Sequence, residues 1–66
     1  REAMDYYRKA IRIQPDYAPA HASLAMAYLA LADGQSALKE YDVVKQLDAG
    51  LAGILGKELR SRGLLQ

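Results

Sequence analysis

The chain has 66 residues, 52 % of them hydrophobic and twelve of them alanine, with no cysteine, phenylalanine or tryptophan. This composition excludes a large core, a disulfide and a cysteine metal site, and it predicts stabilisation by a neighbouring segment or a second chain. The net charge of +1 argues against nucleic-acid binding. The longest stretch without a charged residue is 17–32, which is shorter than the roughly 20 apolar residues of a membrane span. The lack of cysteine fits cytoplasm and periplasm equally, so it leaves the localisation unknown.

Residues 2–14 show the spacing of an amphipathic helix. The apolar positions recur every three or four residues and are Ala3, Met4, Tyr7, Ala10, Ile11 and Ile13. Charged residues occupy the other face, where Asp5 precedes Lys9 by four residues and predicts an ion pair. Pro15 ends this helix, because the residue before a proline is pushed out of the α region.

A second helix is expected from Asp16, as its N-cap, to about Ala32, with Pro19 in its first turn. The helix is apolar on nearly every side, which predicts that neighbouring elements cover it on more than one side. The pair 33–34 breaks the helix, because Gly34 suits the left-handed position at a helix C-terminus.

A third helix is predicted over 36–47 and a fourth over 51–62, where Glu58 precedes Arg62 by four residues. No segment has the alternation of a β-strand. The sequence therefore predicts an all-α fold of four helices in short antiparallel hairpins.

An internal repeat relates the first and third helices. A shift of 34 residues superposes their apolar positions, in the pairs Ala3/Ala37, Met4/Leu38, Tyr7/Tyr41, Ala10/Val44 and Ile13/Leu47. The two helices are therefore expected to be the same structural element, one period apart.

With these residues the chain resembles the tetratricopeptide repeat (TPR) family, whose unit is a helix–turn–helix of about 34 residues. The small and large core positions of the family are matched by Leu24, Ala25, Tyr28, Ala37, Tyr41 and Val44. The resemblance implies antiparallel helix–turn–helix repeats in a superhelical α-solenoid, with the second helix of a partial repeat at 1–14 and one complete repeat at 15–48. Since the match fails after Ala52, residues 49–66 are expected to form a C-terminal capping helix and tail.

The resemblance also implies a concave groove that holds a partner peptide or helix. Matched by position, the groove candidates are Tyr17, Pro19, Ala22, Ser23, Met26, Leu29 and Ala30. Met26 and Leu29 fit a core position equally well. One TPR subtype clamps a C-terminal carboxylate with Lys and Asn at the positions of Ala22, Ser23 and Met26, so an acidic carboxylate-terminal tail is not expected as the ligand.

No group of residues predicts catalysis, a cofactor or a metal. His21 is the only histidine and has no catalytic pattern around it, so it is expected to be a packed or rim residue. Gly53, Gly56 and Lys57 lack the spacing and the following Ser or Thr of a phosphate loop. The chain is therefore not expected to be an enzyme.

The sequence thus favours a protein–protein interaction module, with a scaffold or adaptor role, whose partner is an apolar or amphipathic segment of another protein. The alternative is self-association as a homo-oligomer. The first helix lacks a hairpin partner, which leaves the face of Ala3, Tyr7 and Ala10 open to a second copy. A third hypothesis is a non-catalytic appendage of a larger enzyme.

Overall fold

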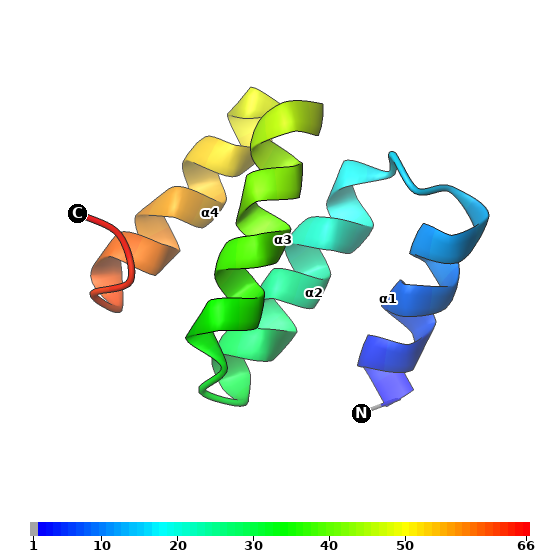
Figure 1. The fold of residues 1–66 in the computed structure, drawn as a ribbon, viewed down its shortest axis with the longest axis horizontal. Coiled ribbons are helices and arrows are strands. Elements are labelled where there is room, and N and C mark those ends of the chain that lie inside the picture. The colour runs from blue at the N-terminus through cyan, green and yellow to red at the C-terminus, as the bar shows by residue number, and fades with distance from the viewer. Residues whose placement is uncertain (1) are drawn as a thin grey trace.

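The computed structural model describes residues 2–66, so position 1 of the predicted segment 1–14 lies outside the described residues. These residues form four α-helices, which are α1 (Glu2–Ile13), α2 (Ala18–Ala30), α3 (Gly34–Leu47) and α4 (Ala49–Ser61). Successive helices run antiparallel and lie side by side in a flat arrangement of 33 × 25 × 14 Å (Figure 1). The predicted all-α fold is confirmed for this part of the chain, which contains no strand.

The helix α2 is the centre of the molecule. It contacts α1, α3 and α4, whereas among the described helices α1 contacts α2 alone. The core lies mainly where α2, α3 and α4 meet, and its buried residues are Ala25, Leu29, Ala37, Val44, Ala52, Leu55 and Leu59. The prediction that α2 is covered on more than one side is confirmed, and its alanines allow its neighbours to approach closely.

The connection between α1 and α2 differs from the prediction by one residue. Tyr17, and not Asp16, is the N-cap of α2, and its side chain makes no capping hydrogen bond. The physical reason is a preceding turn, which the Tyr17 N–H closes by donating to the carbonyl of Gln14 at 3.1 Å. Pro19 lies in the first turn of α2 as predicted, where its missing N–H costs nothing.

The prediction for the end of α2 is wrong. The residue in the left-handed conformation is Ala32, with φ 60°, and not Gly34. The helix ends at Ala30, and the Asp33 N–H donates to the carbonyl of Tyr28 at 2.9 Å while the Ala32 N–H donates to that of Leu29 at 3.0 Å. These two bonds form a Schellman cap, which normally places glycine where Ala32 lies.

Two aspartates begin the last two helices earlier than predicted. The Asp33 carboxylate accepts the Ser36 N–H at 3.2 Å, so α3 begins at Gly34 and not at residue 36. The Asp48 carboxylate accepts the Leu51 N–H at 3.1 Å, so α4 begins at residue 49 and not at 51. Side-chain caps of this kind satisfy N–H groups that have no partner within the helix.

The predicted ion pairs have different outcomes. Arg62 lies 2.8 Å from the Glu58 carboxylate, which confirms that pair. Asp5 pairs with Arg8, at 3.6 Å, and not with Lys9. Both side chains of the Asp5 pair are largely exposed, so it contributes little to stability.

We expect Ala32→Gly to raise the free energy of unfolding by about 0.5–1 kcal/mol. Glycine relieves the roughly 1–2 kcal/mol that left-handed backbone costs other residues, and part of this gain is offset by its greater freedom in the unfolded chain. Urea unfolding followed by circular dichroism measures the change. Ala30→Gly, at the last helical residue of α2, is the matched control and is expected to lower stability. A destabilised Ala32→Gly variant would contradict the assignment of the cap.

We also expect the Asp33 carboxyl to titrate below its ordinary value of 3.8, because the Ser36 hydroxyl and the Ser36 backbone N–H hold its pKa down. Since the folded-state pKa is the lower one, this contact stabilises the fold above about pH 3.8, and the contribution is lost as the pH falls through the folded-state pKa. A ¹³C NMR titration of the carboxyl carbon measures the midpoint. Ser36→Ala should raise the pKa of Asp33. If Asp33 titrates at or above 3.8 in the chain without this substitution, the contact is refuted.

Candidate functional site

A groove runs between α2 and α4, which start at the same end of the molecule (Figure 1). It encloses about 280 Å³ and is lined by Ala22, Ser23 and Met26 from α2 and by Leu51, Ile54, Leu55 and Glu58 from α4. The α4 residues follow a spacing of three, four and seven, which places them on one helical face. Most of the lining side chains are apolar, so we take this groove as the candidate site.

The two walls of the groove differ in shape. The α2 wall has two small side chains, Ala22 and Ser23, so the space above them stays open. The α4 wall carries larger aliphatic groups, with Leu55 buried at the core and Ile54 69 % exposed. Met26 is 43 % exposed on the α2 side, and methionine adapts its shape to different apolar surfaces.

The groove contains one charged lining residue, Glu58, whose carboxylate is held by Arg62 at 2.8 Å. No cation is among the lining residues. The surface that an apolar ligand would contact is therefore almost neutral. A ligand that ends in a carboxylate would find no Lys or Arg side chain among the lining residues.

The remaining sequence-predicted site residues lie in other surroundings. Tyr17 and Pro19 line a second hollow, of about 250 Å³, between α1 and α2, and Ser23 lines both hollows. Ala30 is exposed but lines neither one. Leu29 is 5 % exposed and belongs to the core, and it lines neither of these two hollows.

Sequence reasoning missed the α4 wall. Leu51, Ile54 and Leu55 lie in the segment 49–66, which was expected to be a capping helix and tail, so none of them was a groove candidate. The structure separates Leu55, which packs into the core, from Ile54, which points outward at the rim. The exposure of a large aliphatic residue next to the small residues of α2 depends on how the helices pack.

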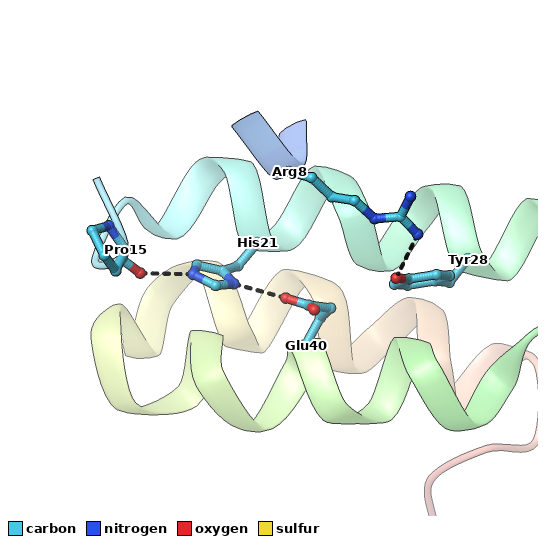
Figure 2. A network of polar contacts seen from close by, with 5 residues as sticks. All are labelled: Arg8, Pro15, His21, Tyr28 and Glu40. Carbon is cyan, nitrogen blue, oxygen red and sulfur yellow. Dashed lines mark hydrogen bonds and ion pairs between the residues drawn. The ribbon is translucent and has the colours of Figure 1, made fainter. Parts of the chain in front are cut away.

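A polar network joins α2 to its neighbours behind the groove (Figure 2). His21 is 7 % exposed, with Nε2 2.8 Å from the Pro15 carbonyl oxygen and Nδ1 2.7 Å from Oε1 of Glu40. The Pro15 oxygen only accepts, so Nε2 is the donor of that hydrogen bond, and Nδ1 makes the hydrogen bond with the Glu40 carboxyl group. Both ring nitrogens are thus occupied by contacts within the protein, which confirms the prediction that His21 is packed.

A second polar contact in Figure 2 links α1 to α2. Arg8 donates to the Tyr28 hydroxyl at 3.2 Å, and this bond raises the pKa of Arg8 above its ordinary value. The guanidinium is charged near neutral pH, so this contact is a charge-assisted hydrogen bond. Arg8 thus links α1 to α2, and His21 links α2 to α3 and to the turn before α2.

Residues 2–66 contain no group of three or more His, Cys, Asp or Glu side chains placed to hold a metal ion. Within that range, no helix has the length and apolar character needed to cross a membrane. Comparisons with protein-family models, with curated proteins and with solved structures give no match.

We expect Glu40→Ala to lower the free energy of unfolding by about 1–3 kcal/mol, because it leaves the buried Nδ1 of His21 without its partner. Glu40→Gln is expected to cost less, since an amide still forms a hydrogen bond with the ring. Urea unfolding measures both changes. Asp42→Ala, which removes an exposed partner of Lys45 on the same helix, is the control and should change stability little. If Glu40→Ala is as mild as this control, the network does not stabilise the fold.

Proposed function

We propose that this chain is a non-catalytic protein-interaction module, built as a TPR-like helical repeat, that binds an apolar or amphipathic segment of another protein. The observation that carries the proposal is the apolar groove between α2 and α4. The proposed role is that of a scaffold or adaptor, in which the groove holds the partner segment.

The repeat assignment is supported by the contacts of α3. This helix packs against both α2 and α4, as the second helix of a repeat would when it lies between two first helices. The residues of α3 that match α1 one period earlier include the fully buried Ala37 and Val44. In this interpretation, 15–48 is one repeat, α1 ends the repeat before it, and α4 closes the array as a cap.

The dimensions of the groove favour a protein segment over a small molecule. It holds only about 280 Å³ and its rims are open helix surfaces, whereas a small-molecule site buries most of the surface of its ligand. A groove of this size accommodates one or two apolar side chains of a partner. Burial of one such side chain contributes about 1.5–3 kcal/mol, so the groove serves as an anchor point for a longer segment.

The test is an NMR titration of the ¹⁵N-labelled chain with a synthetic helical peptide of about 16 residues, with leucine at helical spacing and glutamine elsewhere. We expect shifts at Ala22, Met26 and Ile54. Both Ala22→Asp and Met26→Asp should weaken binding at least about tenfold, because a charge in the groove must lose its water.

Ala30→Asp is the matched control, since Ala30 is exposed on α2 but does not line the groove. Circular dichroism verifies that each variant is folded. Unchanged binding by folded Ala22→Asp and Met26→Asp would show that the peptide does not use the groove. A peptide ending in acidic residues is expected to bind more weakly than the leucine peptide.

A further inference from the structure

The His21–Glu40 pair joins three parts of the chain, which are the α1–α2 turn, α2 and α3 (Figure 2). The two side chains are 9 % and 19 % exposed, so water has little access to the contact between them. Both ring nitrogens face oxygen, because Nε2 lies 2.8 Å from the Pro15 carbonyl oxygen and Nδ1 lies 2.7 Å from Oε1 of Glu40. A carbonyl oxygen accepts hydrogen bonds, and so does an ionised carboxylate.

The two hydrogen bonds together require one proton more than a neutral ring and an ionised carboxylate contain. A neutral imidazole has a single N–H group. If Nε2 holds it, the bond to Pro15 forms, and the lone pair of Nδ1 then faces a carboxylate that has no hydrogen to donate. An additional proton, on the ring or on the carboxyl group, restores the second bond. Both contacts therefore exist together only when the pair holds this proton.

The loss of that proton leaves one ring hydrogen for two acceptors. A hydrogen bond to an ionised carboxylate is roughly twice as strong as one to a neutral carbonyl, so the remaining hydrogen stays on Nδ1, beside Glu40. The lone pair of Nε2 then opposes that of the Pro15 oxygen. Pro15 lies in an exposed turn, whereas His21 is buried in α2, so the turn moves and its carbonyl accepts from water.

The turn matters because α1 has few other attachments. Among the described helices α1 contacts α2 alone, and its side chains are tied to α2 by the hydrogen bond from Arg8 to the Tyr28 hydroxyl. The bond from His21 to Pro15 fixes the C-terminal end of α1, two residues after its last helical residue. Release of Pro15 therefore loosens the end of α1 while the Arg8 contact remains.

The charged groups around the pair come from α1 and α3. Glu40 is on α3, and Arg8 on α1 lies near enough for its charge to act on that of Glu40. Within residues 2–66, neither His21 nor Glu40 has a hydrogen bond or ion pair with α4 or with Asp16 in the turn. Arginine keeps its charge up to pH 12, so histidine is the side chain of this network that ordinarily changes charge between pH 5 and 8.

We propose that the His21–Glu40 pair is a proton-dependent link, which holds the α1–α2 turn when it is protonated and releases Pro15 when the proton leaves. The link is complete at low pH and is lost as the pH rises through the titration of the ring. The proposal does not depend on the function of the α2/α4 groove.

The experiment follows the ring and the turn by NMR between pH 5 and 9. The chain has one histidine, so its side-chain ¹⁵N signals report the protonation and the neutral tautomer of His21 without ambiguity. The Tyr17 N–H donates to the Gln14 carbonyl across the turn, and its protection against solvent exchange reports the state of the turn. The intrinsic exchange rate at each pH is divided out.

We expect the ring to change from the doubly protonated form to the tautomer with hydrogen on Nδ1. The Tyr17 protection factor should fall about two- to tenfold with the same midpoint, because one hydrogen bond to the turn is lost. The Asp33 N–H, which is bonded to the Tyr28 carbonyl at the other end of α2, is the internal control and should keep its protection.

Glu40→Gln separates the proton effect from simple packing. The glutamine amide can donate to Nδ1 of a neutral ring while Nε2 still donates to Pro15, so both contacts persist without the extra proton. In this variant the neutral ring should hold its hydrogen on Nε2, and the Tyr17 protection factor should no longer change with pH. Asp42→Asn, at an exposed carboxylate of the same helix, is the matched control and should retain the pH dependence.

Four results would overturn the proposal. The first is a ring that keeps one protonation state from pH 5 to 9, and the second is a neutral ring with its hydrogen on Nε2 in the chain without substitutions. The third is a Tyr17 protection factor that does not change while the ring titrates. The fourth is a pH dependence of Tyr17 that survives in folded Glu40→Gln. No peptide is present in these measurements, so they leave the proposed function of the groove untouched.

Discussion

The close contact between α2 and α3 is the constraint on which the rest of the structure depends. Ala25 from α2 and Ala37 and Val44 from α3 are fully buried, so the two helices meet through small side chains. Small residues let the helices approach closely, but each buries little apolar area. They also leave α2 free to contact α1 on one side and α4 on the other. The groove and the open face of α1 are both consequences of this central position.

Polar contacts complement a core of this kind. Alanine surfaces interlock less than surfaces with large side chains, so they restrain sliding and rotation of one helix on another only weakly. His21 is held at both ring nitrogens, by the Pro15 carbonyl and by Glu40, and it therefore couples the α1–α2 turn to α3. Arg8 and Tyr28 similarly join α1 to α2. The directional hydrogen bonds specify positions that apolar burial alone leaves loose.

The sequence was sufficient to predict what depends on helical periodicity. The four helices, the cover around α2 and the Glu58–Arg62 pair all follow from spacing along the chain. The sequence was insufficient where a single hydrogen bond decides at which residue a helix begins or ends. Asp33 and Asp48 each begin a helix sooner than the apolar pattern indicated, and the cap of α2 uses Ala32 although Gly34 is two residues away. Met26 and Leu29 could not be separated by sequence, because both are apolar residues of α2 and only the packing of its neighbours makes one a rim and the other core.

Apolar contact attracts any apolar partner, so charge in the α2/α4 groove must select among the segments that it could bind. The α2/α4 groove is nearly neutral, because its one charged lining residue, Glu58, is paired with Arg62. An uncharged apolar segment loses no Coulomb energy in the groove, whereas an acidic segment finds no cation among the lining residues.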